Sequence, residues 1–530
     1  MPIPLSARRR RNAVLEGKTV APRRSSSAIT IDGHSLTLDN LEQVARADSA
    51  PVIRVSANAR RAMQRSRDLV NRVIAEERTV YGINTGFGHL ADVRIDADAL
   101  EALQRNLIVS HAAGIGPGCA RDQVRAMVLL RLNCLACGHS GARVEIAERL
   151  ADLLTHDICP VVPCRGSVGA SGDLAPMAHI ALTLIGEGKV RYRQRLTSAR
   201  RALAAIKLRP LVLEPKEGLA LINGVQASTA IVALALTDMK RLIEAQDAVC
   251  ALTAVALGAR RDAFDPRIAE ARPHPGQVLS AKRLNGWLEG SDQPDPATLR
   301  VQDPYSVRCA PQVHGPCREV IDSSCEVCER EVNAATDNPL LFPAEGEVIS
   351  GGNFHGAIIG HTADRCAAAI ADAASISERR VSLLMDPCIS GASRFLTPLG
   401  GEGVNSGMMM WQVTAAALVS EMKTLSHPAS VDSIPTSLYQ EDHVSMSMWA
   451  ARKLAECVDL WRQVLAIEAV AAWRALLIKR QVPVHGRLKR VAEGIAENHG
   501  RRLEDAILGD VMAKVGDELD AIIRYIPPGR

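Results

Sequence analysis

The sequence predicts a mainly α-helical fold with a long central helical bundle. The stretch from 226 to 257 contains neither glycine nor proline and is far longer than an average helix. Two more stretches of unusual length, 355–385 and 440–481, have helical character, and a shorter one at 405–425 lies between them. Because signals for strands are rare, these helices must bury their apolar faces against one another, as in a bundle.

The composition is that of a large globular chain. It has 530 residues, of which 47% are hydrophobic, so it has enough apolar side chains for a large core. Its formal net charge of +4 is small for this length, and only 3% of its residues are aromatic. We therefore expect neither nucleic acid nor a membrane as a partner. Charges such as Asp364, Glu378 and Lys453 interrupt the long apolar stretches, which argues against membrane-spanning helices.

Thirteen cysteines, an odd number without a secretory signal, are typical of reduced thiols and indicate a cytoplasmic protein. Two pairs, Cys134/Cys137 and Cys325/Cys328, have the spacing of zinc and redox sites. Both pairs lie in apolar or helical stretches without a flanking turn, and the histidines show no HExxH pattern. The sequence therefore predicts no metal site.

The N-terminal part begins with a basic segment. Residues 1–28 are rich in arginine and serine with little apolar periodicity, which indicates a disordered tail. An arginine-rich presequence is the alternative, although Glu16 and a weak amphipathic pattern argue against it. From Ile29, alternation around Asp32-Gly33 predicts a short hairpin, and helical sequence starts at Val44. Further helices are expected over 100–112, 121–135 and 144–154.

The segment 166–176 has the sequence GSVGASGDLAP and contains three glycines within seven residues, so its backbone can bend sharply. Asp173 is placed to cap a helix over 174–186, and Pro176 suits the first turn of that helix. The loop therefore lies at the positive end of a helix dipole. A P-loop would need Gly-Lys-Ser/Thr, which is absent. We expect an N-terminal domain over 29–216 that carries this loop and a long-helix domain over 217–530.

The run GSVGASGDLAPMAH resembles the signature of the aromatic amino acid ammonia-lyases, and most closely that of the histidine ammonia-lyases. The resemblance implies that Ala170, Ser171 and Gly172 cyclise autocatalytically to 4-methylideneimidazole-5-one, so no external cofactor is needed. It also implies a bundle of the fumarase/aspartase-like type, with active-site loops in a smaller N-terminal region. The chemistry needs such a group because ammonia is a poor leaving group and ordinary side chains are not strong electrophiles.

Three further motifs are implied to act in catalysis. In YGINTGFG, Tyr81 matches the base that removes the β-proton, a role that suits a phenol if neighbouring charges lower its pKa. In GLALINGVQ, Asn223 is implied to donate a hydrogen bond to the carbonyl oxygen of the prosthetic ring. In QEDHVSM, Glu441 is the carboxylate that distinguishes histidine ammonia-lyases and can hold an imidazole.

Other motifs are implied to bind the substrate, and one of them also carries Tyr305, which the resemblance counts among the catalytic residues. VQDPYSVR places Tyr305 and Arg308 three residues apart. The guanidinium can fork onto the substrate carboxylate, while Tyr305 faces its amino group and ring. The resemblance assigns Asn338 of TDNP to the same carboxylate and Gln302 to a further contact with the substrate. Phe354 of GGNFH is implied to pack near the prosthetic ring, with a plain core role as the alternative.

Substrate choice depends on Ser110 and His111 in NLIVSHAAGIG. By resemblance, lyases for phenylalanine have Phe-Leu there and those for tyrosine have His-Leu. Since His111 and Glu441 can both hydrogen-bond an imidazole, we expect L-histidine as the substrate and trans-urocanate as the product. A 2,3-aminomutase and a tyrosine ammonia-lyase stay open because the sequence departs from the family pattern at four positions: Leu438, Tyr439, His314 and Met422.

The resemblance also implies a homotetramer whose active sites are built from more than one subunit. Burial of alanine-rich helix faces between protomers would suit a chain this apolar with so few aromatics. A non-catalytic helical scaffold is the alternative from a different functional class. The presence of Ser171, Tyr81, Asn223 and Arg308 at their motif positions argues against it.

Overall fold

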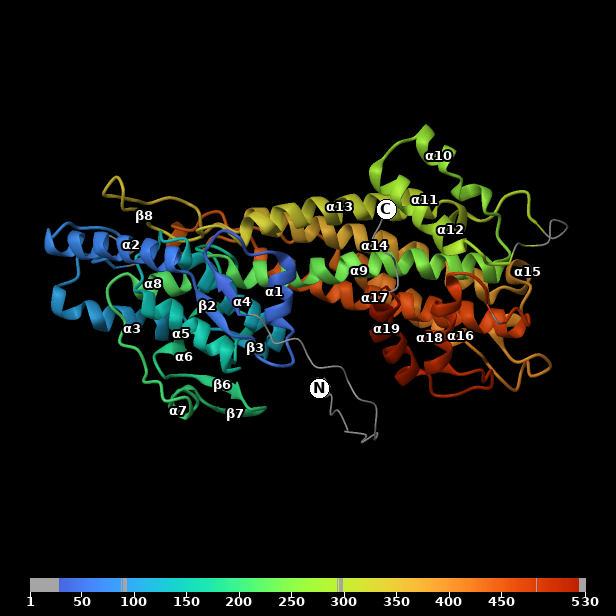
Figure 1. Cartoon of the computed structure of the whole chain (residues 1–530), viewed down its shortest axis with the longest axis horizontal. Helices are drawn as coiled ribbons and strands as arrows, with labels where there is room; N and C mark the ends of the chain where they lie inside the picture. Colours follow the sequence, from blue (N-terminus) through green and yellow to red (C-terminus); the bar gives the residue numbers. More distant parts are fainter. Residues whose placement is uncertain are drawn as a thin grey trace.

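A computed structural model describes residues 28–86, 88, 93–292, 294, 299–482 and 484–523. Long helices run along the long axis of the molecule and form its centre (Figure 1). They are α9 (Gln226–Leu257), α13 (Ala310–Glu331), α14 (Ala357–Met385), α16 (Met409–Leu425) and α17 (Ser447–Ile478). The predicted mainly helical fold with a long bundle is confirmed.

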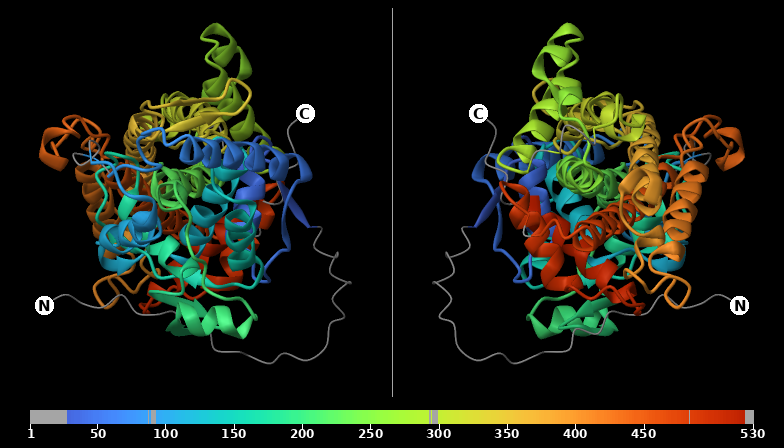
Figure 2. Two further views of the ribbon diagram at one scale, coloured as in Figure 1. Left: turned by 90° about the vertical axis from the view of Figure 1, so that its left-hand side faces the viewer. Right: turned by 90° about the vertical axis from the view of Figure 1, so that its right-hand side faces the viewer.

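The central helices α9 and α17 are buried on almost every side because other helices surround them, as the end-on views in Figure 2 show. Trp461 of α17 donates its indole N–H to Oε1 of Gln246 in α9 at 2.7 Å, so a polar pair is satisfied inside the apolar core. The predicted stretch 440–481 was too long at its start. Met446 takes a left-handed conformation with φ of 54°, and the helix begins only after it.

The N-terminal region packs against one end of the bundle (Figure 1). The helices predicted over 100–112, 121–135, 144–154 and 174–186 are confirmed to within two residues at each end. The elements of this region are β1 (Ile29–Ile31), α1 (Leu38–Ala45), β2 (Ile53–Val55), α2 (Ala57–Ala75), α3 (Leu100–His111), β3 (Ile115–Gly118), α4 (Arg121–Ala136), α5 (Val144–Thr155), β4 (Cys159–Pro160), β5 (Pro163–Arg165), α6 (Leu174–Leu184), β6 (Lys189–Tyr192), β7 (Arg195–Ser198), α7 (Ala199–Ala205) and α8 (Glu217–Ile222).

The predicted hairpin at Asp32-Gly33 is wrong. Strand β1 pairs in parallel with β2, Ile29 lying opposite Ile53, and α1 connects the two strands. The turn packs on α4 instead, where Gly33 donates its N–H to Oδ1 of Asn133 at 3.0 Å. A Cβ at Gly33 would lie 2.6 Å from the nitrogen of Cys137, so only glycine fits this contact. The basic tail expected over 1–28 lies, except for its last residue, outside the described residues.

A later segment of the chain returns to the N-terminal region. The hairpin of β8 (Leu340–Phe342) and β9 (Glu347–Ile349) packs there, and Leu341 donates its N–H to the carbonyl of His139 at 2.9 Å. Leu341 also joins Val70 and Ile83 in a small apolar cluster. Residues near 340 therefore help to shape the end of the molecule that carries the glycine-rich loop.

Shorter helices gather at the opposite end of the bundle (Figure 1). They are α10 (Pro266–Ala271), α11 (Pro275–Leu288), α12 (Tyr305–Arg308), α15 (Pro387–Ser390), α18 (Leu488–His499) and α19 (Gly509–Ile523). Within the described ranges, no helix is both long and apolar enough to cross a membrane. All thirteen cysteines are free thiols. The part of the chain that the structure covers holds no cluster of three or more metal-binding side chains.

Candidate active site

The glycine-rich loop lies directly beside the start of α9. Gly172, with φ of +74°, forms a short parallel bridge with Gly224, and Asp173 donates its N–H to the Gly224 carbonyl at 2.8 Å. A Cβ on Gly172 would overlap the backbone of Gly224. Only glycine can therefore occupy position 172, and its nitrogen is held at a fixed place.

Asp173 does not cap α6 as predicted, since its side chain makes no hydrogen bond to that helix. Its carboxylate instead accepts bonds from the N–H of Ser228 at 2.7 Å and from the Ser228 hydroxyl at 2.8 Å. Ser228 lies in the first turn of α9, so Asp173 caps the N-terminus of α9 although it is not adjacent to that helix in the sequence. Ser167 also donates to Asp173, at 2.9 Å. Burial raises the pKa of Asp173, and the bonds from Ser228 and Ser167 oppose that rise.

Three motifs that are far apart in the sequence meet at Ser171. Its hydroxyl donates to Oε1 of Glu441 at 3.0 Å, and Nδ2 of Asn223 donates to its carbonyl oxygen at 3.4 Å. Thr436 orients the same carboxylate by donating its hydroxyl to Oε2 of Glu441 at 2.6 Å. The structure thus brings together Ser171, Asn223 and Glu441, as the sequence motifs indicated.

Tyr81 lies at the same end of the molecule as the glycine-rich loop. Its neighbour Gly82 packs against Leu219 of α8, and its hydroxyl oxygen accepts the N–H of Gly88 at 3.4 Å. Burial raises the pKa of Tyr81, and the carboxylate of Glu441 raises it further. The condition for its role as a base, a pKa lowered by neighbouring charges, is not met within the described part of the single chain, because the charges that act on it are the carboxylates of Glu441 and Asp337.

Asn338, the residue assigned to the substrate carboxylate, is buried. Its Oδ1 accepts the N–H of Gly351 at 2.7 Å and the hydroxyl of Ser350 at 3.1 Å, so its amide nitrogen is the atom available to donate to an anion. The preceding residue, Asp337, forms a fully buried ion pair with Lys216 at 2.9 Å. That pair ties the TDNP turn to the start of α8.

Ser110 and His111 form the last turn of α3. Nδ1 of His111 lies 2.8 Å from the carbonyl of Leu107, which leaves Nε2 as an acceptor when the ring is neutral. A little further on, Gly114 donates its N–H to Nε2 of His179 in α6 at 3.2 Å. A Cβ on Gly166 would come within 3.0 Å of Gly114, so the end of α3 reaches the start of the glycine-rich loop.

Phe354 is half-buried at this end of the bundle. Its neighbour His355 stacks on His443 with ring centroids 5.9 Å apart, and Gly356 lies against Ser447. The motifs GGNFH and QEDHVSM are therefore side by side. Phe354 directly precedes His355, the residue that makes this contact.

The motif VQDPYSVR, which carries Tyr305 and Arg308, lies elsewhere. Arg308 places its guanidinium 4.6 Å from the centre of the Tyr305 ring and donates to Oε1 of Gln302 at 3.1 Å. The intervening Ser306 contacts Arg380, whereas the loop contacts Ser447, which packs on Gly356. The 24 residues of α14 between Gly356 and Arg380 span about 36 Å. A single chain therefore does not bring Arg308 to Ser171.

Two of the four departures from the family pattern are not at this site. His314 is fully buried in the bundle, where its Nδ1 lies 2.6 Å from Oδ1 of Asp247, and Met422 is fully buried in α16. In the single chain both side chains therefore lie in the interior of the bundle and away from Ser171. Leu438 and Tyr439 are 76% and 78% exposed and precede Glu441 closely. These two can influence what reaches the site.

One residue that supports the site escaped the sequence analysis. Arg131 is fully buried in α4 and donates to the carbonyl oxygens of Asn223 at 2.6 Å and Ala220 at 3.1 Å. It holds the backbone of Asn223 at the junction of α8 and α9. The sequence contains a signal for this role, because an arginine inside the apolar stretch 121–135 requires buried hydrogen-bond partners.

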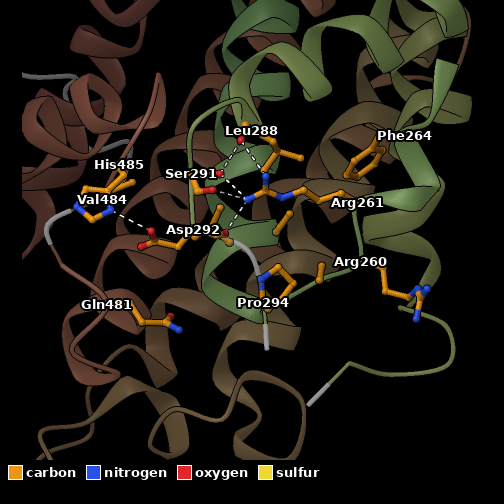
Figure 3. A pocket seen from close by; sticks show the side chains of 14 residues that line it. Arg260, Arg261, Phe264, Leu288, Ser291, Asp292, Pro294, Gln481, Val484 and His485 are labelled. Atoms are coloured by element: carbon orange, nitrogen blue, oxygen red, sulfur yellow. Dashed lines mark hydrogen bonds and ion pairs between the residues drawn. The ribbon is translucent and has the colours of Figure 1, made fainter. Parts of the chain in front are cut away.

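A cavity of about 60 Å³ lies at the far end of the molecule (Figure 3). Arg261 projects into it, but its guanidinium donates to main-chain oxygens of Leu288, Ser291 and Asp292 at 2.6 to 3.1 Å. Because these oxygens occupy its donors, Arg261 ties the end of α11 to the segment after α9. This cavity is therefore a poor candidate for the catalytic site.

Comparisons with known proteins identify the family of the chain. Residues 36–497 match the model of the aromatic amino acid lyase family. The chain is 49% identical to the histidine ammonia-lyase of Symbiobacterium thermophilum over 85% of its length and 88% of that protein.

Solved structures are similar over nearly the whole fold. The crystal structure of histidine ammonia-lyase from Trypanosoma cruzi superposes with a TM-score of 0.87 and 36% identity over 94% of this chain and 96% of that one. Tyrosine aminomutase from Streptomyces globisporus has a TM-score of 0.89 and 32% identity, over 94% of this chain and 98% of that one. From its motifs, its fold and these relatives, the chain belongs to the aromatic amino acid lyase family.

Proposed function

We propose that this chain is a carbon–nitrogen lyase that eliminates ammonia from L-histidine to give trans-urocanate. The observation that carries the proposal is the meeting of Ser171, Asn223 and Glu441 at a loop whose Gly172 cannot be replaced. The 49% identity to a histidine ammonia-lyase supports the choice of substrate.

The residues at the loop fit a 4-methylideneimidazole-5-one group made from Ala170, Ser171 and Gly172. In such a ring the Ser171 carbonyl becomes the ring carbonyl, and this is the oxygen that Nδ2 of Asn223 approaches at 3.4 Å. Asn223 would therefore stabilise negative charge on that oxygen. The group supplies the electrophile that side chains lack.

The side chains around the loop divide the remaining work. Glu441, anchored by Thr436, can accept the N–H of an imidazole, and Nε2 of His111 can hydrogen-bond the same ring. Tyr81 removes the β-proton. Since burial and Glu441 raise the Tyr81 pKa in the single chain, its function as a base requires a cation that the described part of this chain does not bring to the site.

We propose that a second subunit brings that cation, in a homotetramer. Tyr305 is 70% exposed and lies with Arg308 about 36 Å along α14 from the loop, so the pair can serve only the site of another copy. Exposed apolar side chains on the bundle and its loops suit burial between subunits. They include Val404, Met410, Val413, Val431 and Ile434. Thirteen free thiols suit the reducing cytoplasm.

An ultraviolet assay with L-histidine, L-tyrosine and L-phenylalanine, followed by identification of the products, tests the proposal. Histidine should react fastest and give urocanate, since a phenyl ring would leave His111 and Glu441 unpaired. An intact mass that lacks two water molecules relative to the sequence would show that the ring has formed. The unmodified mass together with no turnover would indicate a non-catalytic scaffold.

The second candidate is a 2,3-aminomutase or a tyrosine ammonia-lyase with the same prosthetic group. Tyr439, which is exposed two residues before Glu441, and the close fold of the tyrosine aminomutase favour it. A β-amino acid among the products, or faster turnover of tyrosine than of histidine, would support this candidate over the first.

A further inference from the structure

The segment that leads into α17 closes over the upstream half of the glycine-rich loop. Ser445 donates its hydroxyl to the carbonyl of Gly169 at 3.0 Å, and Met446 donates its N–H to the carbonyl of Val168 at 2.8 Å. Ser445 is only 3% exposed. Two successive carbonyls of the loop are therefore held by a segment far along the chain, in which Ser445 comes 276 residues after Gly169.

The contact leaves Ser445 little freedom. A Cβ on Gly169 would overlap its hydroxyl, and a Cβ on Gly356 would lie 2.9 Å from it, so two glycines provide the space that Ser445 fills. The N–H of Ser447 donates to the Ser445 hydroxyl at 3.3 Å, which leaves the hydroxyl proton directed at Gly169.

The downstream half of the loop is held separately. Gly172 lies against Gly224, and Asp173 is bonded to Gly224 and Ser228. The loop is thus fixed on both sides of Ala170 and Ser171. These are the residues whose relative position decides whether Gly172 can reach the Ala170 carbonyl.

We propose that Ser445 is a positioning residue for the formation of the prosthetic group, an inference that rests on the proposed function. The nitrogen of Gly172 bonds to the carbonyl carbon of Ala170, and the carbonyl oxygen leaves as water with the N–H protons of Gly172 and Ser171. The hydroxyl of Ser171 leaves as a second water with its Cα proton, which creates the exocyclic double bond. No oxidant or reductant is needed.

The physical reason is the weakness of the nucleophile. An amide nitrogen attacks a carbonyl only when the two are held close in the right orientation, and fixing that geometry is worth a large effective concentration. The hydrogen bond from Ser445 fixes the peptide plane between Gly169 and Ala170, so that only φ and ψ of Ala170 remain to set the direction in which its carbonyl faces Gly172. Loss of this bond should slow ring closure without changing any reacting atom.

Ser445→Ala and Ser447→Ala form a matched pair for the test. Both serines are buried in the same turn, but the hydroxyl of Ser447 has no hydrogen-bond partner in the described part of the chain. The full-length chain would be made by cell-free translation. Samples taken at intervals would be mixed with denaturant to stop the maturation reaction. Intact mass spectrometry then follows the loss of two waters. We expect Ser445→Ala to mature about five- to tenfold more slowly than the native chain, and Ser447→Ala within about twofold of it.

The outcomes separate this inference from the proposed function. A native chain that never loses water would refute the prosthetic group itself. A native chain that matures, together with equal rates for Ser445→Ala and Ser447→Ala, would refute only the role of Ser445. Circular dichroism shows whether each variant is folded. If Ser445→Ala does not fold, Ser445→Cys, which keeps a weak donor of similar size, should mature at an intermediate rate, and a native rate there would overturn the inference.

Discussion

Glu331 is a half-buried carboxyl near the candidate active site, and we expect it to make stability depend on pH. It lies at the end of α13 beside Gln226 and Thr336, which are bonded to each other next to Gly224. Among the described residues nothing forms a hydrogen bond or ion pair with its carboxylate. Burial raises its pKa from 4.5 to about 7.

The sign of the effect follows from this shift. Below pH 4.5 Glu331 is protonated in both the folded and the unfolded chain, so it imposes no penalty. Between pH 4.5 and 7 the unfolded chain loses the proton first, and the folded state is progressively destabilised as the pH rises. A rise of the pKa from 4.5 to about 7 corresponds to at most about 3.4 kcal/mol. Since Glu331 is partly exposed, we expect about 1–3 kcal/mol.

Glu331→Gln removes the penalty and should therefore stabilise the protein at pH 8 but not at pH 4.5. Thermal melts of the native protein and the variant at both pH values measure the difference. Glu326→Gln is the control, because Glu326 is exposed on the same helix. An equal change in melting temperature at the two pH values, or an equal gain from Glu326→Gln at pH 8, would refute the reasoning.

Three further predictions concern the active site. Ser171→Ala should keep the fold, because the loop remains small, yet lose the prosthetic group and nearly all activity; normal deamination by this variant would contradict the assignment. Glu441→Gln should lower the turnover of histidine by about 10² to 10⁴-fold, measured as urocanate formation, and an unchanged rate would argue against a role for Glu441 with the imidazole. Arg308→Ala and Ser171→Ala chains, each inactive alone, should regain activity when they are unfolded and refolded together, because mixed assemblies contain some sites with both native residues. No recovery despite mixed tetramers by native mass spectrometry would place Arg308 and Ser171 in one chain's site.

The sequence by itself determined the features that depend on neighbouring residues. The absence of glycine and proline over 226–257 was enough to predict α9, because helix formation depends on local backbone preferences. The sequence of the loop at 166–176 likewise indicated the segment that we propose to react, since Ala170, Ser171 and Gly172 are adjacent. The motifs of Asn223 and Glu441 pointed to the same site, and the structure brings both to Ser171.

Only the tertiary structure decided which distant groups satisfy one another. Asp173 precedes α6 but caps α9, because Ser228 offers both its N–H and its hydroxyl there. Strand β1 pairs in parallel with β2 because α1 carries the chain back. The same holds for Ser445, whose partner Gly169 lies in another part of the chain, and for Arg308, which the length of α14 separates from the loop. Local sequence cannot specify these contacts, because each depends on how the long helices align when they bury their apolar faces together.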